Sequence, residues 1–217
     1  PPPDMSDLMA HTAPGVYPQG YMNGEMAEKA CRNASKRLCA LDEWKLACNG
    51  GDAARRYPYG PTFIEGKCNV NKTNPHVLDL FYWDTPHKLR NKESFWINPC
   101  LDKISLDLPA DDECMVRISQ SPNLARNPDG GIALRYWEKT GVFQECVSPG
   151  GVYDMEGNGS EWLSDTKSVP GDSTIHGYFA GNPASSHYKD GCEHHTSAHW
   201  RTWKDYSLTI RCCTDAK

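Results

Sequence analysis

Residues 151–162, with the sequence GVYDMEGNGSEW, constrain the fold of this chain more than any other stretch. The apolar pair Val152 and Tyr153 is strand-prone, and the glycines that follow permit a turn with positive φ and uncovered carbonyl groups. Asp154 and Glu161 place one carboxylate on each side of this turn. Because calcium prefers hard oxygen donors on a tight loop, the segment predicts a calcium site. The alternative is a surface turn with two solvated acids.

Ten cysteines among 217 residues are the second constraint. Their number is even and no CxxC…CxxC pattern of a zinc site occurs, so disulfides formed in an oxidising compartment are the better interpretation. The chain has no apolar run of membrane-spanning length and no signal peptide, and it opens on PPPDM without Met, which favours a processed form. We therefore expect a secreted, periplasmic or extracellular protein.

Composition and length indicate one loop-rich globular domain. Hydrophobic residues make up 38% of the chain and charged residues 24%, with 18 Gly and 16 Pro. The Pro- and Gly-rich residues 1–22 predict an extended lead-in, and residues 23–217 a single domain. A net charge of −5 without a basic cluster argues against nucleic acid as a partner.

Two helices are predicted near the N-terminus. Residues 23–34 begin at a candidate N-cap, Asn23, and carry an apolar stripe. Residues 41–48 carry acids at their start and are followed by Asn-Gly-Gly, which ends a helix. Residues 72–132 show no regular period, which predicts loops with short helices. We expect strands within residues 132–143, 176–179 and 206–213, and a Gly/Ser/Asp loop after residue 162.

Three segments carry a family resemblance. Residues 151–162 resemble the G-L-Y-D-M-x-G-N-x-x-E-W signature of the formylglycine-generating enzyme family, the sulfatase-modifying-factor domain, a variant of the C-type lectin fold. KRLC-x-x-x-EW-x-x-AC at residues 36–48 resembles the family's K-R-L-P-T-E-A-E-W-E-x-A motif, and YSLTIRCC at residues 206–213 resembles its terminal G-F-R-C strand. The resemblance implies a loop-rich α+β fold with two N-terminal helices, short antiparallel strands and several disulfides.

The resemblance also implies two disulfides, Cys31–Cys212 and Cys48–Cys192. We pair the other six cysteines by elimination, as Cys39–Cys213, Cys68–Cys146 and Cys100–Cys114.

Calcium ligands are implied position by position. In the organising loop they are the side chains of Asp154 and Glu161 and the carbonyl groups of Gly157 and Gly159. Trp162 is expected to turn inward and anchor this loop. The Asn69 side chain and the Val70 carbonyl occupy positions of a second calcium site, for which Asp84 is a further candidate. The alternative for Asn69 is that it caps a turn.

The family's copper chemistry is not expected here. Formylglycine-generating oxidases bind copper through two cysteines shortly after an R-G-G-S-aromatic strand. Aligned on Gly177, those positions are Gly181 and about Ser186, and neither side chain supplies the thiolate that holds Cu(I). Tyr178 replaces the serine of that strand.

A histidine cluster offers a different metal site. His195 and His199 have i, i+4 spacing, which on a helix would place both rings on one face, and His194 is adjacent. Copper or non-haem iron would be the metal. The alternative is that His199 packs among Trp and Tyr side chains and that the others are solvated or hydrogen-bonded.

Two functions therefore remain open, because no G-x-S-x-G elbow or P-loop occurs. The first is a secreted, calcium-stabilised, disulfide-rich module on the family scaffold, non-catalytic and binding a protein or glycan through its loops. The second is a metal-dependent oxidase that uses the cluster His194, His195 and His199.

Overall fold

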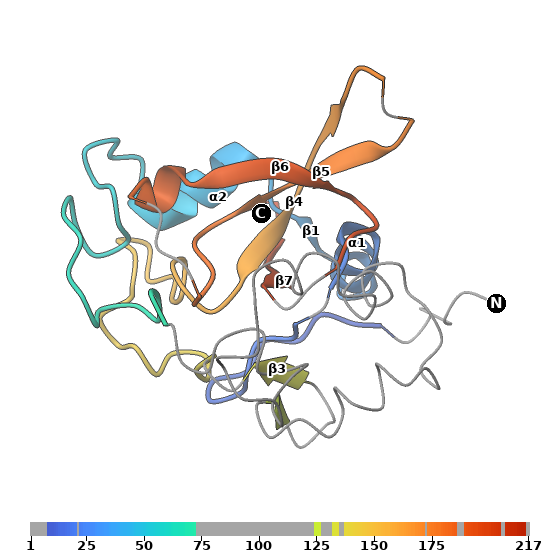
Figure 1. Ribbon diagram of the computed structural model, residues 1–217. Coiled ribbons are helices and arrows are strands. Elements are labelled where there is room, and N and C mark those ends of the chain that lie inside the picture. Colours follow the sequence, from blue (N-terminus) through green and yellow to red (C-terminus); the bar gives the residue numbers. More distant parts are fainter. Residues whose placement is uncertain are drawn as a thin grey trace, which may run out of the picture.

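The computed structural model describes residues 8–20, 22–72, 124–126, 132–134, 137–171, 173–185, 189–204 and 207–215. The helices and the sheet lie side by side, and long loops extend from the edge of the fold near α2 (Figure 1). None of the helices in these ranges is long and apolar enough to cross a membrane. The predicted loops of residues 72–132 fall almost entirely outside the described ranges.

Both predicted helices are confirmed. Helix α1 spans Gly24–Asn33, and its N-cap is Asn23, whose side-chain oxygen accepts a hydrogen bond from the Met26 backbone N–H at 2.8 Å. Helix α2 spans Leu41–Asn49 and ends at Gly50, which has a positive φ of 69°. The local capping signals were therefore sufficient to place both helices.

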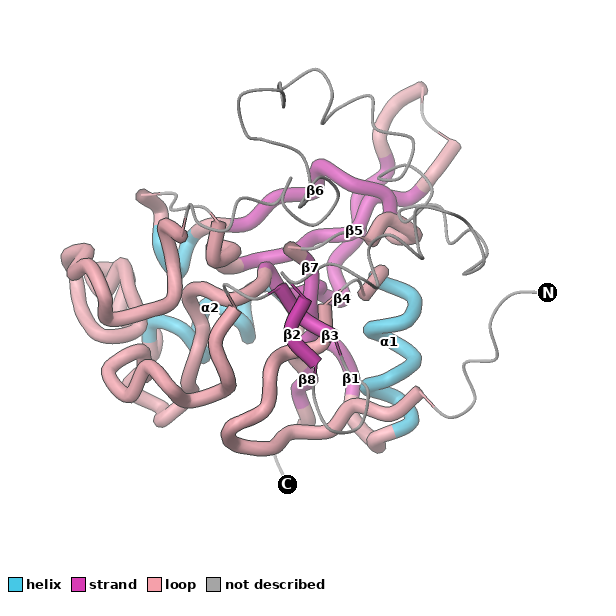
Figure 2. The backbone as a smooth tube through the Cα atoms, turned by 60° about the horizontal axis from the view of Figure 1, so that its bottom comes forward, coloured by secondary structure: helices cyan, strands magenta, loops and turns pink. Residues whose placement is uncertain are grey.

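A four-stranded sheet packs against the helices, with strand order β6-β5-β4-β7 (Figures 1 and 2). Strand β7 pairs with β4 in parallel, whereas the β4–β5 and β5–β6 pairs are antiparallel. The expectation of antiparallel strands was therefore incomplete. The four strands are β4 (Ser160–Ser168), β5 (Ile175–Ala180), β6 (His195–Trp200) and β7 (Leu208–Ile210).

Two further strand pairs are antiparallel. Strand β1 (Arg37–Leu38) pairs with β8 (Cys212–Cys213), and β2 (Leu124–Arg126) pairs with β3 (Ile132–Leu134). A short 3₁₀ turn, η3 (Gly191–Glu193), precedes β6. Pairing of β1 with β8 brings the segment between the two helices next to the end of the described chain.

The Gly/Ser/Asp loop predicted after Trp162 is wrong, because β4 continues to Ser168. Residues 164–168 are polar and mostly exposed, so they carry no apolar alternation from which a strand is predicted. Their strand form comes from pairing with β5, in which Thr166 lies opposite Gly177 and Ser168 opposite Ile175. Tertiary pairing decided this segment, not its own pattern.

Trp162 lies at the centre of the core and confirms the inward anchor. It is completely buried, and its indole N–H donates to the Met22 carbonyl at 2.7 Å. The Phe179 ring packs edge-on against it, with 5.3 Å between ring centroids. Gly177 is required beside it, because a Cβ at that position would lie 2.7 Å from the indole.

Among the described residues, three disulfides join the helical segment to the C-terminal part of the chain, and a fourth joins two loops. Cys31–Cys212 and Cys48–Cys192, implied by the resemblance, are confirmed, as are Cys39–Cys213 and Cys68–Cys146. Cys100 and Cys114 lie outside the described residues. The bridges Cys31–Cys212, Cys39–Cys213 and Cys48–Cys192 close loops with sequence separations of 181, 174 and 144 residues, respectively. In the chain-entropy model each such bridge stabilises the fold by roughly 4–5 kcal/mol before strain.

The described part of the lead-in, residues 8–20, contains no helix or strand. It is nevertheless attached to the domain by backbone hydrogen bonds. The Ala10 N–H donates to the Ala30 carbonyl of α1 at 3.0 Å, and Thr140 exchanges bonds with Gly15 and Val16 at 3.1 and 2.8 Å. This segment therefore runs along the surface of the domain.

Candidate functional site

The Glu161 carboxylate joins the three motif segments. Its Oε2 accepts a hydrogen bond from the Trp44 indole N–H at 2.7 Å and another from Arg211 Nε at 2.7 Å. Arg211 Nη2 also donates to the Tyr153 carbonyl at 3.1 Å. The Glu161 side chain is 8% exposed, so the ion pair is largely removed from water. A buried carboxylate without a charged partner is costly, so Arg211 stabilises the loop in this position.

Asp154, the other carboxylate of the loop, has a positive φ of 58°. Its Oδ2 accepts a hydrogen bond from the Gly141 N–H at 2.8 Å. Burial raises the pKa of this carboxyl, while the Gly141 bond and the Arg211 charge oppose the rise and the Glu161 charge adds to it. A cation at this position would stabilise the charged form.

The donor chemistry of the loop fits a hard divalent cation. Among the described residues, the hydrogen bonds of the two carboxylates go to Asp154 Oδ2 and Glu161 Oε2. Asp154 Oδ1 and Glu161 Oε1 are thus without a hydrogen bond from that part of the chain. Oxygen atoms of this type, together with loop carbonyl groups, are the ligands that calcium takes.

The turn between the carboxylates requires its glycines. Gly157 has φ of 93°, and a Cβ there would lie 2.4 Å from the Asn69 carbonyl oxygen. A Cβ at Gly159 would lie 2.9 Å from the Trp137 ring. Any side chain at either position would push the loop away from its neighbours.

Asn69, assigned from the sequence to a second calcium site, lies directly against this loop. It is 2% exposed, and its Nδ2 donates to Asn158 Oδ1 at 2.8 Å. The Asn158 N–H donates in return to the Asn69 carbonyl at 3.2 Å. Val70 follows and is 8% exposed. The structure therefore places Asn69 against the turn of the first predicted site, whereas Asp84 lies outside the described residues.

Glu156 is a buried acid that the sequence analysis missed. It is 2% exposed, its Oε2 accepts a hydrogen bond from Asn182 Nδ2 at 2.6 Å, and its Oε1 is buried without a partner in the described ranges. Burial raises its pKa to about 8, against the hydrogen bonds from Asn182, and the Asp190 charge adds to the rise. The signal in the sequence was an acid at the variable position of the D-M-x-G-N motif.

The candidate histidines do not converge on one point. His195 and His199 lie on strand β6, so the helical interpretation of their spacing is wrong. Four residues of a strand span about 13 Å, too far for two rings to share a metal ion. Nor do the described ranges contain any group of three His, Cys, Asp or Glu side chains placed to hold a metal ion.

Each of the three candidate histidines has a structural environment of its own. The His199 ring stacks on Phe179 and on Trp203, with centroids 5.7 and 4.7 Å apart. His195 Nδ1 is hydrogen-bonded to the Glu193 carbonyl at 2.7 Å. Burial lowers the pKa of His194, whose Nδ1 lies 3.7 Å from Asp190. Packing of His199 among aromatic rings matches the structural alternative.

Gly181, at the position of the first copper ligand in the resemblance, is a buried residue with φ of 82°. A Cβ there would lie 3.1 Å from the Trp44 ring and 3.2 Å from the Met155 carbonyl oxygen. Its N–H donates to the His194 carbonyl and its carbonyl accepts from the Ser160 hydroxyl. Ser186 lies outside the described residues.

Disulfides bind the two helices to the C-terminal part of the chain, and an Arg–Glu–Trp cluster closes the glycine loop. These features define a loop-rich α+β protein of the C-type-lectin-like class. The family model of the sulfatase-modifying factor enzyme 1-like domain matches residues 14–207, and the chain belongs to this family.

One similar solved structure is titled "Crystal Structure of CarF". It is 16% identical, with a TM-score of 0.44, and the match covers 81% of this chain and 46% of that one. The chain thus spans about half the length of that structure. No curated protein matches the sequence.

The buried ion pair generates a first prediction. Arg211→Ala leaves the Glu161 carboxylate buried without its partner and should lower the free energy of unfolding by roughly 3–5 kcal/mol. Arg37→Ala removes the exposed pairs with Glu43 and Asp215 and should cost no more than about 1 kcal/mol for each pair. Urea unfolding of both variants measures the difference. An equal loss in the free energy of unfolding for both variants would show that the Glu161–Arg211 pair stabilises the fold no more than an exposed pair does.

The raised pKa of Glu156 generates a second prediction. The unfolded chain releases this proton near the ordinary value of 4.5, whereas the folded chain holds it to about pH 8. Between these values the folded state binds more protons, so stability falls as pH rises, by up to about 1.4 kcal/mol per pH unit. Glu156→Gln removes this contribution, so its stability relative to wild type should increase steadily from pH 5 to pH 8.

Urea unfolding across this pH range checks the result. Glu193→Gln, which changes a half-exposed carboxylate paired with Lys45, is the matched control and should show no such trend. A difference between Glu156→Gln and wild type that stays constant with pH would contradict the raised pKa.

Proposed function

We propose that this chain is a secreted, calcium-stabilised, disulfide-rich module with a binding or structural role, which retains the family scaffold without the copper chemistry of formylglycine generation. The observation that carries the proposal is Gly181. It occupies a buried, left-handed turn under Trp44, where even a Cβ is tightly confined. A thiolate ligand has no room there unless the core moves.

The cysteines support the same conclusion. Every cysteine in the described part of the chain belongs to a disulfide. Cys192, the first cysteine after β5 in the sequence, is bonded to Cys48. A disulfide sulfur is not an anionic donor, and Cu(I) is held in proteins by soft thiolate or thioether ligands.

Calcium has a structural role in this proposal. The Asp154 and Glu161 carboxylates and the Gly157 and Gly159 carbonyl groups would hold it, with Arg211 remaining on the opposite oxygen of Glu161. The ion would supply positive charge to two partly buried carboxylates and fix the turn between them. Asn69, which lies against the same loop, and the neighbouring Val70 would belong to a second site.

Four disulfides support an oxidising, extracytoplasmic location, since cytosolic thiols are kept reduced. A frame that is bridged in this way can present long loops with little loss of conformational entropy on binding. A protein or a glycan is the partner class that suits such loops.

The absence of formylglycine generation is the third prediction. Incubated with Cu(I), oxygen and a sulfatase-derived cysteine peptide, the protein should leave the peptide mass unchanged, because no thiolate pair holds the metal. A formylglycine-generating relative converts the same peptide in parallel and validates the mass-spectrometric assay. Peptide turnover that is lost in Cys192→Ser would overturn both the Cys48–Cys192 disulfide and the non-catalytic role.

Calcium binding is the fourth prediction. An ion that binds only the folded state at 100 times its Kd adds about 2.7 kcal/mol of stability, so chelator should lower the Tm by several degrees. Asp154→Ala should lower the Tm and reduce the response to calcium to what the second site contributes, while Glu193→Gln should keep the full response. Calorimetry with EDTA and with added calcium measures both effects. A Tm that ignores chelator would contradict the proposal.

A further inference from the structure

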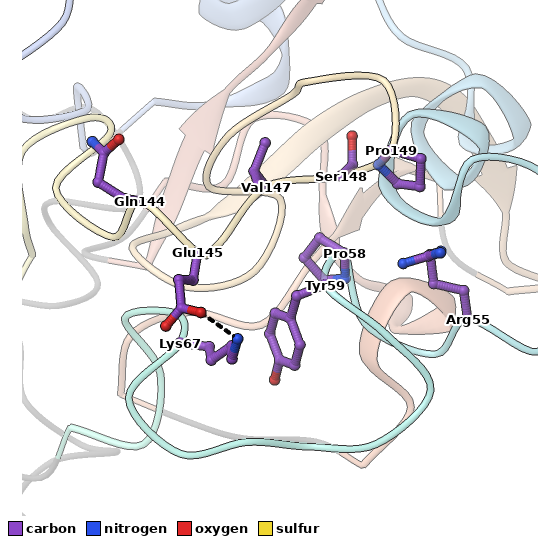
Figure 3. Close-up of a pocket in the computed structure, with 9 residues that line it drawn as sticks. All are labelled: Arg55, Pro58, Tyr59, Lys67, Gln144, Glu145, Val147, Ser148 and Pro149. Atoms are coloured by element: carbon purple, nitrogen blue, oxygen red, sulfur yellow. Dashed lines mark hydrogen bonds and ion pairs between the residues drawn. The ribbon is translucent and has the colours of Figure 1, made fainter.

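An open pocket of about 370 Å³ lies between the turn at residues 55–59 and the loop at residues 144–149 (Figure 3). Its volume is within the range of small-molecule sites, roughly 300–1,000 Å³. It is lined by both charged and apolar side chains. The pocket contains none of the proposed calcium ligands, so it is a separate feature of the surface.

Arg55 forms one wall of the pocket and has a donor without an acceptor. Its Nε is buried and makes no hydrogen bond within the described residues, whereas its backbone N–H is bonded to the Asp52 carbonyl. A buried, unsatisfied donor costs roughly 1–3 kcal/mol, and more when it is charged. A ligand cannot reach this buried Nε. The guanidinium nevertheless lines the pocket, and its two Nη groups can donate two parallel hydrogen bonds to a carboxylate.

The opposite wall is rigid and electrically balanced. Lys67 Nζ is paired with Glu145 Oε1 at 2.5 Å, as the dashed line in Figure 3 shows. Each of these residues precedes a cysteine of the Cys68–Cys146 disulfide, which holds the two side chains together. Arg55 therefore gives the charged lining a net positive charge.

Tyr59 forms the fixed floor between these walls. Its ring stacks on Tyr57, with centroids 5.6 Å apart and an interplanar angle of 8°. Its hydroxyl oxygen accepts a hydrogen bond from the Ile64 N–H at 3.2 Å, so the hydroxyl proton can be donated to a ligand. In Figure 3 the Arg55 guanidinium and the Lys67 ammonium lie on opposite sides of this ring.

We infer that this pocket binds the uronic-acid unit of an acidic glycan. The sugar carboxylate pairs with the Arg55 Nη groups, its hydroxyl groups exchange hydrogen bonds with Tyr59 and Gln144, and the C–H face of the ring packs on the exposed Pro149. The open side lets neighbouring sugars leave the pocket. This assignment rests on the proposed binding role and names its ligand class.

The test titrates the folded full chain with D-glucuronate and D-glucose, monitored by ¹⁵N–¹H spectra at low salt. Glucuronate should shift the backbone signals of the pocket, and glucose should bind at least about tenfold more weakly, since it lacks the charge. Arg55→Gln should weaken glucuronate binding by a similar factor. Arg56→Gln, which changes the exposed neighbour, should leave binding as in wild type.

A variant expected to bind glucuronate more tightly separates a loss of affinity from misfolding. Glu145→Gln removes a carboxylate that is 70% exposed and frees Lys67, so it should tighten glucuronate binding severalfold. Equal binding of glucose and glucuronate, or an Arg55→Gln variant with unchanged affinity, would overturn the inference. So would tighter binding of N-acetylglycine, because the pocket would then select a peptide carboxylate.

The titration is independent of the cysteine-peptide assay. Peptide turnover with normal glucuronate binding would remove the proposed non-catalytic role and leave the pocket intact. No glucuronate binding, together with no turnover, would remove the ligand assignment alone.

Discussion

The ion pair between Glu161 and Arg211 is the interaction on which the rest of the structure depends. It lies where α2, through Trp44, meets the organising loop and the end of β7. Desolvating two charges is costly. The cost is offset here by short hydrogen bonds from Trp44 and Arg211 to one oxygen of the Glu161 carboxylate. The pair therefore stabilises one arrangement of three distant segments and leaves a misassembled arrangement with a buried, unpaired charge.

Much of this arrangement was predictable from the sequence, for reasons that differ between elements. Asn23 and Gly50 are local signals, and the helices that they bound follow from neighbouring residues alone. The inward position of Trp162 and two of the bridges followed from motif resemblance. Strand β4 beyond Leu163 did not, because its polar residues are strand only through their pairing with β5.

The candidate site shows the same division. The loop residues and Asn69 were predicted from the sequence as ligands, but their mutual contact spans 89 positions and has no local signature. The spacing of His195 and His199 suits a helix and a strand alike, and only the sheet decides between them. Glu156 was missed because the cost of a buried acid depends on its surroundings, which the sequence does not display.

The adjacent cysteines of β8 also constrain how the molecule is made. Cys212 and Cys213 bridge to residues on either side of β1, and β7, just before them, supplies the parallel partner of β4. During synthesis the N-terminal helices therefore emerge with thiols whose partners do not yet exist. Contacts of such long range form slowly, so premature bridges among early cysteines compete with folding. This protein is accordingly one whose yield depends on an environment that reshuffles disulfides as well as forming them.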